Sequence, residues 1–153
     1  MLSKRKITFI IIFVLLLIIC SLTYVLIIVA IGLPINDNNE KYSNLVAYFF
    51  KAILIAPLIE TVFFQFIPIE FLRILKINNR INIFITAFVF GLMHYFNSFL
   101  LREFLFTFVC GFIYSYVYIL YSKKFNLLNT ITTVSIIHAG YNLFVFSLKA
   151  LDT

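Results

Sequence analysis

Charge is scarce in this sequence: only 12% of its residues are charged, whereas 63% are hydrophobic. Stretches of about 20 residues lack an ionised side chain, although a soluble helical domain needs charges along the outer face of every helix. The scarcity excludes a soluble domain and predicts that lipid surrounds most helices. The net charge of +6 comes from basic residues at the ends of apolar runs. That placement is typical of membrane orientation signals, so we expect the lipid bilayer as a partner and no nucleic acid.

Cysteine is also scarce, since Cys20 and Cys110 are the only two. Both lie inside apolar runs, and neither forms a CxxC pair or part of a disulfide framework. We interpret them as packing residues. The sequence has no internal repeat and no low-complexity linker, which favours one compact membrane domain.

Five apolar runs, each close to the ~20 residues that a spanning helix needs, are bounded by charged or turn-forming residues. The sequence therefore predicts an all-α, polytopic membrane helix bundle of about five transmembrane helices. The first run is about twice as long as the apolar region of a signal peptide, so residues 1–34 are expected to be a retained transmembrane anchor helix. Residues 45–148 are expected to form a core of four helices. The runs lie near 7–31, 46–67, 82–97, 104–121 and 127–147.

The basic residues alternate between the two sides of the predicted bundle. Eight of the twelve Lys and Arg residues fall on alternate loops, which predicts that the N-terminus is inside and the C-terminus outside. We expect a multi-pass protein of the plasma membrane. Glu70 follows Pro68 at the predicted cytoplasmic end of the second helix, and 77–82 is predicted to be a tight cytoplasmic turn.

Glu60 is the one carboxylate in the middle of a predicted helix, where it should cost roughly 3 kcal/mol or more if it faced lipid. Pro57 precedes it by three residues and should kink the helix, which exposes a carbonyl beside the carboxylate. Glu60 is predicted to lie roughly 10–15 Å from the cytoplasmic end of its helix. Both histidines, His94 and His138, also lie inside predicted helices, at about 17–18 Å from the cytoplasmic ends. Asn142 follows His138 by four residues and shares its helical face. An interhelical hydrogen bond would explain any one of these residues, but four at compatible depth favour a shared site.

A carboxylate, two imidazoles and an amide in a wet intramembrane pocket support hydrolysis. Glu60 would abstract a proton from water, and the His or Asn donors would stabilise the oxyanion. The sequence has neither a GxSxG motif nor a Ser-His-Asp arrangement, so it does not indicate a covalent nucleophile. No cofactor is expected: His94, His138 and Glu60 are suitable zinc ligands by type, but HExxH is absent and no local spacing supports a metal site.

Glu60, the two histidines and Asn142 lie in three short motifs. These motifs and their order along the chain resemble those of the CAAX-protease and bacteriocin-processing family of intramembrane proteases, also called Abi or CPBP. The resemblance covers about residues 50–147. It implies that Glu60 activates water, that His94 assists it, and that His138 with Asn142 forms the oxyanion pocket. It also implies a peptide or membrane-anchored protein substrate, such as a prenylated CAAX protein, a bacteriocin leader or a signalling peptide. The motifs are Glu60-Thr61-xxx-Gln65, Phe90-xxx-His94 and His138-xxx-Asn142.

Two positions depart from the usual family pattern. The first motif normally begins with paired glutamates and ends in Arg, whereas this chain has Thr61 and Gln65 there. Losing both charges together avoids leaving one of them buried and alone. Thr61, Gln65 and Phe90 are expected to bind the substrate or to support the site. Two other hypotheses stay open: a non-catalytic immunity or regulatory module that binds a partner, and a small proton or solute transporter.

Overall fold

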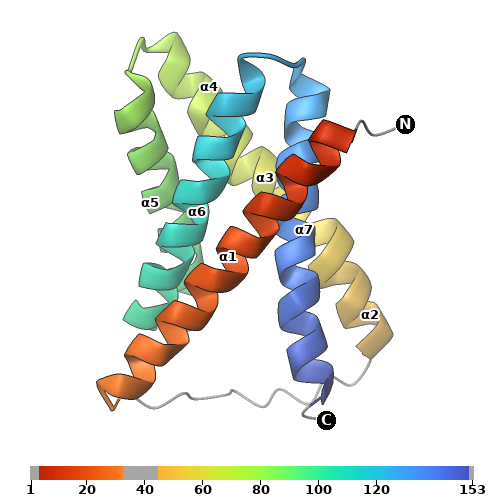
Figure 1. Cartoon of the computed structure of the whole chain (residues 1–153). Helices are drawn as coiled ribbons and strands as arrows, with labels where there is room; N and C mark the ends of the chain where they lie inside the picture. Colours follow the sequence, from red (N-terminus) through yellow and green to blue (C-terminus); the bar gives the residue numbers. More distant parts are fainter. Residues whose placement is uncertain (1–3, 33–44, 152–153) are drawn as a thin grey trace.

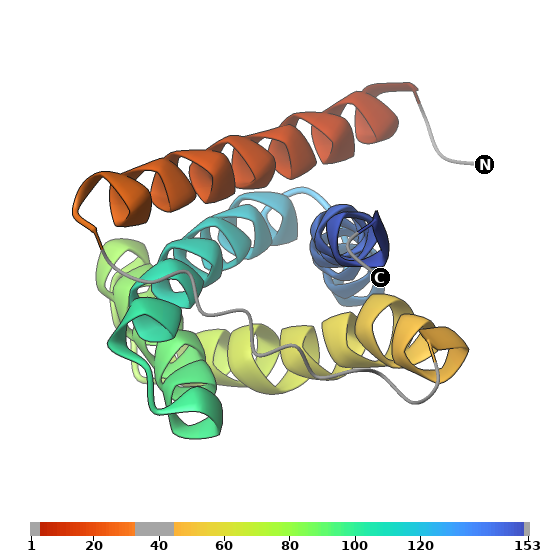
Figure 2. The same cartoon turned by 90° about the horizontal axis from the view of Figure 1, so that it is seen from below.

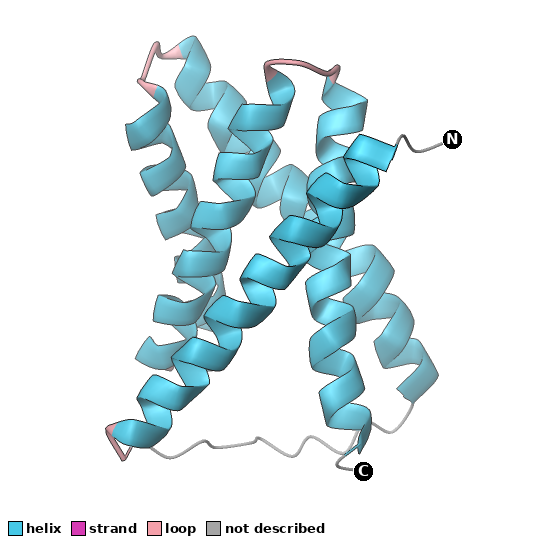
Figure 3. Cartoon of the chain, in the orientation of Figure 1, coloured by secondary structure: helices cyan, strands magenta, loops and turns pink. Residues whose placement is uncertain are grey.

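The computed structural model describes residues 4–32 and 45–151, and within these ranges it is helical apart from short turns, with no strand (Figures 1 and 3). Five helices are long and apolar enough to cross a membrane. The predicted all-α bundle is therefore confirmed. The helices are α1 (Lys4–Ala30), α2 (Leu45–Phe50), α3 (Ala56–Thr61), α4 (Ile67–Ile74), α5 (Asn79–Ser98), α6 (Leu101–Ser122) and α7 (Leu127–Leu151).

The second membrane span, Val46–Ile74, is one continuous helical rod made of α2, α3 and α4. Two π-helical turns, Lys51–Ile55 and Val62–Phe66, join these three pieces. In each turn the hydrogen bond reaches back five residues: the Ala56 N–H donates to the Lys51 carbonyl, and the Ile67 N–H to the Val62 carbonyl. Each turn also comes just before a proline that sits in the first turn of the next helix.

The five spans surround a core to which α6 contributes more buried side chains than any other helix. Seen from one end of the bundle, α1 and the second span lie on opposite sides of α6 and α7 (Figure 2). Helices α5 and α6 form an antiparallel pair with extensive contact. Both cysteines are free, and Cys110 is buried in the core, in agreement with a packing role.

Two predicted boundaries are wrong. The second span continues for a full helix beyond residue 67, because proline is tolerated in the first turn of α4, where no intrahelical donor is needed. The turn before α5 is shorter than predicted and comes earlier than 77–82. Asn78 caps α5 by accepting hydrogen bonds from the N–H groups of Arg80 and Ile81, at 3.1 and 3.0 Å. Asn82 is buried inside α5 and donates to the Ile69 carbonyl, 3.0 Å away.

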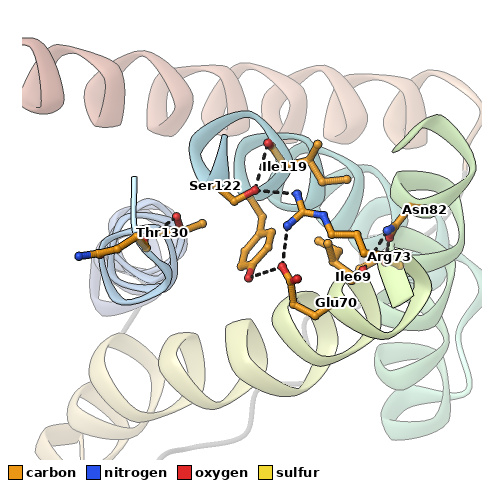
Figure 4. A network of polar contacts seen from close by, with 10 residues as sticks. Ile69, Glu70, Arg73, Asn82, Ile119, Ser122 and Thr130 are labelled. Carbon is orange, nitrogen blue, oxygen red and sulfur yellow. Dashed lines mark hydrogen bonds and ion pairs between the residues drawn. The ribbon is translucent and has the colours of Figure 1, made fainter. Parts of the chain in front are cut away.

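A polar network ties α4 to α6 at the end of the bundle where the second span finishes (Figure 4). Glu70 Oε1 accepts hydrogen bonds from Arg73 Nη1 at 2.6 Å and from the Tyr118 hydroxyl at 3.0 Å. Arg73 Nη2 donates to Ser122 Oγ at 2.7 Å. These bonds fix the register of the second span against α6, and therefore the depth at which the rest of the second span lies.

Glycines let two pairs of helices approach closely. A Cβ atom at Gly111 of α6 would lie 2.9 Å from Phe90 Cβ and 3.2 Å from Ala87 Cα of α5. A Cβ atom at Gly140 of α7 would lie 2.9 Å from Val14 of α1. Close backbone approach at small residues is a main source of helix association in membranes.

Gly111→Ala should lower the free energy of unfolding by about 1–3 kcal/mol, because the new methyl group overpacks against Phe90 Cβ, which cannot move without its backbone. Thermal or SDS-induced unfolding in detergent micelles would measure the change. Phe112→Ala is the control, since Phe112 is 44% exposed and lies on the same helix. Equal effects of the two substitutions would contradict the assigned packing of α5 on α6.

Candidate active site

Glu60 lies in α3, between the two π-helical turns, and its side chain is only 18% exposed. Its Oε2 atom is 3.6 Å from His94 Nε2 of α5 and 3.7 Å from His138 Nε2 of α7. The two imidazoles therefore meet one carboxylate oxygen from two different helices. Three of the four predicted catalytic side chains come together at this point.

The three side chains share a depth in the bundle. Glu60 lies 14 residues before the end of α4, His94 15 residues after the start of α5, and His138 11 residues after the start of α7. At 1.5 Å per residue, these spacings correspond to about 21, 22 and 17 Å from the same end of the bundle. His94 is deeper than predicted because α5 begins three residues earlier than the predicted helix. Glu60 is also deeper than the predicted 10–15 Å, because the second span continues to Ile74.

Two aromatic rings hold the imidazoles. Phe90 is 1% exposed and makes edge contacts with His94 and His138, at centroid distances of 4.9 and 6.0 Å. The Tyr114 ring of α6 stacks on His138 at 4.6 Å. Phe90 was predicted to support the site, whereas Tyr114 was missed, because it is one of nine tyrosines and lies in an apolar run without a motif.

Asn142 does not point its amide at the carboxylate of Glu60; its Nδ2 donates a hydrogen bond of 2.9 Å to the Ala52 carbonyl. That carbonyl has lost its donors within the helix. The Ala56 N–H, four residues on, bonds to Lys51, and Pro57, five residues on, has no N–H. The carbonyl that Pro57 was predicted to expose is therefore held by Asn142. The amide nitrogen carries a second N–H, which this bond does not use.

Asn142→Leu should lower the free energy of unfolding by about 1 kcal/mol or more, because the part-buried Ala52 carbonyl loses its donor. In a Pro57→Ala background the same change should cost less, since the substituted residue regains an N–H that can donate to this carbonyl. A double-mutant cycle on unfolding free energies measures the coupling. Additive effects would show that Pro57 is not the reason why the Ala52 carbonyl needs the hydrogen bond from Asn142.

Thr61 and Gln65, the two departures from the family pattern, are fully buried. Thr61 Oγ1 and both polar atoms of the Gln65 side chain have no hydrogen-bond partner. The same holds for Glu60 Oε2 and His94 Nε2. Each buried polar atom without a partner lowers the free energy of unfolding by about 1–3 kcal/mol. A fold retains such atoms where a ligand or a reaction needs them. The unsatisfied atoms of Glu60 and His94, which lie 3.6 Å apart, mark this point as a candidate site.

A cavity of about 570 Å³ lies at one end of the bundle, and His94 is the member of the Glu60, His94 and His138 group that forms part of its wall. The remaining wall is supplied by α1, the turn between α5 and α6, and the last turns of α7. It is partly apolar and partly polar. Representative lining residues are Tyr24, Asn97, Arg102, Glu103, Phe144 and Lys149.

A metal centre finds no support in the part of the chain that the structure describes. There, no group of three or more His, Cys, Asp or Glu side chains can hold a metal ion. Glu60, His94 and His138 are zinc-ligand types, and their mutual distances of 3.6 and 3.7 Å are close contacts between a carboxylate and two imidazoles. That no cofactor is needed therefore stays a prediction, which chelation tests.

The fold and this site define a polytopic membrane protein in which Glu60, His94 and His138 meet inside the helix bundle. The family model of type II CAAX prenyl endopeptidases, Rce1-like, matches residues 42–144 and so includes all three side chains. The chain belongs to this family of membrane-embedded proteases. Neither the curated proteins nor the solved structures gave a significant match.

Proposed function

We propose that the protein is an intramembrane endopeptidase in which Glu60 acts as the general base. The observation that supports the proposal most directly is the contact of Glu60 Oε2 with the Nε2 atoms of His94 and His138. A general base in a low-dielectric site needs such neighbours, because imidazoles can orient the water and share its proton.

The reaction consumes one water and breaks one peptide bond. Glu60 takes a proton from water as the oxygen attacks the substrate carbonyl carbon. N–H groups of His138 and of Asn142, whose amide has a second hydrogen, stabilise the oxyanion. The tetrahedral intermediate collapses, the C–N bond breaks, and the proton held by Glu60 passes to the leaving amine with the help of His94. The products are a carboxylate and an amine.

The proposed substrate is a peptide or a membrane-anchored protein segment, and prenylated CAAX-type chains are one candidate that the family suggests. The plasma membrane is the proposed location. We test the activity with protein purified in detergent or in liposomes and incubated with a peptide library, whose products are identified by mass spectrometry. Reproducible cleavage supports the proposal.

Chelation should leave the reaction unchanged. The proposed steps use only Glu60, His94, His138 and Asn142, so EDTA or 1,10-phenanthroline should not alter the initial rate of cleavage. The readout is the rate before and after prolonged dialysis against each chelator. A loss of activity that added Zn²⁺ restores would replace the metal-free mechanism with a metal-dependent one.

A non-catalytic immunity or regulatory module is the second candidate, and the departures from the family motif at Thr61 and Gln65 favour it. At these two positions the family usually has a glutamate and an arginine, so this chain lacks both charges. If Glu60→Ala left the cellular phenotype intact while disruption of helix packing by Gly111→Ala removed it, this second candidate would replace the protease.

A further inference from the structure

Helix α7, which carries His138 and Asn142, packs between two other parts of the bundle. On one side it contacts α3 and the first π-helical turn of the second span, and on the other side it contacts α1. Figure 2 shows α1 and the second span on opposite sides of α7. The place of α7 in the bundle, and therefore of its two polar side chains, depends on both contacts.

The contact between α7 and α1 is tightest at Gly140. A Cβ atom at this glycine would lie 2.9 Å from Val14 Cγ2, which is closer than real Cβ atoms come to a neighbour. Gly140 follows His138 by two residues, or about 200° around the helix, so α1 contacts the face of α7 opposite to His138. A valine in a helix has one strongly preferred rotamer, so Val14 is a stiff support.

A hydrogen bond adds a second contact between the same two helices. The Tyr141 side chain is 7% exposed, and its hydroxyl donates to Ser21 Oγ at 3.2 Å. Val14, Leu17 and Ser21 are three and four residues apart, so they lie on one stripe of α1. Leu17 is fully buried in the core, whereas Leu15 is 52% exposed. One narrow stripe of α1 therefore supports α7.

On the side of α7 that faces the second span, the contacts are those of the candidate active site. His138 Nε2 lies 3.7 Å from Glu60 Oε2, and Asn142 Nδ2 lies 2.9 Å from the Ala52 carbonyl. A displacement of α7 relative to α1 would change both distances. Helix α1 precedes residues 42–144, so the family match does not include this support.

We propose that α1 is a positioning element of the active site, in which Val14 and Ser21 hold α7 where His138 meets Glu60. Helix α1 then does more than anchor the chain in the membrane, because the proposed donor to the oxyanion stands on the helix that α1 supports. Val14 and Ser21 act through α7 and touch no reacting atom. Groups that hold a catalytic side chain from behind determine how well it is oriented. The consequence for catalysis rests on the proposed protease function.

The chain has only two histidines, so the surroundings of His138 can be observed directly. Protein with ¹⁵N-labelled histidine rings is reconstituted in liposomes for solid-state NMR, and the signals are assigned with a His94→Gln variant. Gly140→Ala should shift the His138 ring-nitrogen signals, because the new methyl group meets Val14 and displaces α7. Val14→Ala in the same protein should restore them, since the Val14 Cβ that remains lies 3.9 Å from the new methyl position.

Leu15→Ala is the control for these variants, because Leu15 is the exposed neighbour of Val14. It should leave the His138 signals unchanged. Unshifted signals in Gly140→Ala, or a shift that Val14→Ala does not reverse, would overturn the inference, whatever the protein catalyses.

The hydrogen bond is tested in the same way. Ser21→Ala removes the acceptor of the Tyr141 hydroxyl, whereas Ser21→Thr keeps it. The first change should shift the His138 signals and the second should leave them close to wild type. Equal shifts in the two variants would remove Ser21 from the positioning role.

Kinetics in detergent test the effect on catalysis. Gly140→Ala should lower kcat by about tenfold with a much smaller change in KM, since a misplacement of about 1 Å can cost about 10²-fold in rate. The double variant with Val14→Ala should regain most of the lost kcat. Recovery of the unfolding temperature without recovery of kcat would show that α1 supports folding alone, and would overturn the positioning role. Absence of cleavage by the wild type would remove the protease function, and the histidine signals would still decide whether α1 positions His138.

Discussion

Glu60→Gln should lower the kcat of peptide cleavage by about 10²–10⁴-fold, the usual contribution of a general base. Glutamine keeps the shape of the side chain but cannot take a proton from water. The carboxylate is 18% exposed, and among the described residues it is the one that pairs with both imidazoles. Single-turnover cleavage of a library peptide by purified protein gives the rate.

Glu70→Gln is the matched control, because it makes the same change ten residues further along the same span. The Gln side chain can still accept the hydrogen bond from Tyr118, and the ion pair with Arg73 is part-exposed, at 29% and 37%. Activity should remain close to wild type and the fold intact. Equal losses in the two variants would assign the effect to stability and leave Glu60 without a catalytic role.

His138→Phe should lower kcat by about 10²–10³-fold, the cost of losing one donor to a developing oxyanion. Phenylalanine keeps an aromatic ring stacked on Tyr114 and in contact with Phe90, so the packing of α6 and α7 is preserved. Only the ring nitrogens are lost. The kcat from single-turnover experiments, together with the unfolding temperature in detergent, separates chemistry from stability.

Tyr114→Phe is the comparison for this change. It retains the stack on His138 and removes a buried hydroxyl that has no partner, so most of the activity should remain. If Tyr114→Phe lost as much activity as His138→Phe, the stacking environment and not the imidazole nitrogen would be the essential feature.

The five spans are predictable from the sequence because lipid demands long apolar runs and internal hydrogen bonding of the backbone. The ends are harder to predict. Residues near Pro68 look like the end of a helix, yet the π-helical turn before it lets the second span continue to Ile74. Asn82 looks like a turn residue, yet it is buried and bonds across to Ile69. The first error arises because the backbone beside Pro68 accommodates the proline within the helix, and the second because the partner of Asn82 lies on another helix.

The predicted depth of the two histidines and Glu60 was close enough to bring them together, since rise per residue and span boundaries determine it. What Asn142 contacts was not predictable. Its partner, Ala52, depends on a shift in backbone hydrogen bonding that has no sequence signal beyond Pro57. Tyr114 was missed for a related reason, because stacking across helices leaves no trace in the spacing of residues along one of them.

The π-helical turns that flank Glu60 have a consequence for insertions and deletions. A π-helical turn accommodates one more residue than an α-helical turn does. Deleting one residue from Lys51–Ile55 or from Val62–Phe66 would restore α-helical bonding and leave the two flanking pieces nearly in phase, because the turn loses only its extra residue. A deletion inside α3, which has no extra residue to lose, would instead rotate one side of the span by roughly 100° about its axis. Relatives that lack one residue in a π-helical turn could therefore keep the direction of the Glu60 carboxylate, whereas relatives that lack one residue in α3 would lose it.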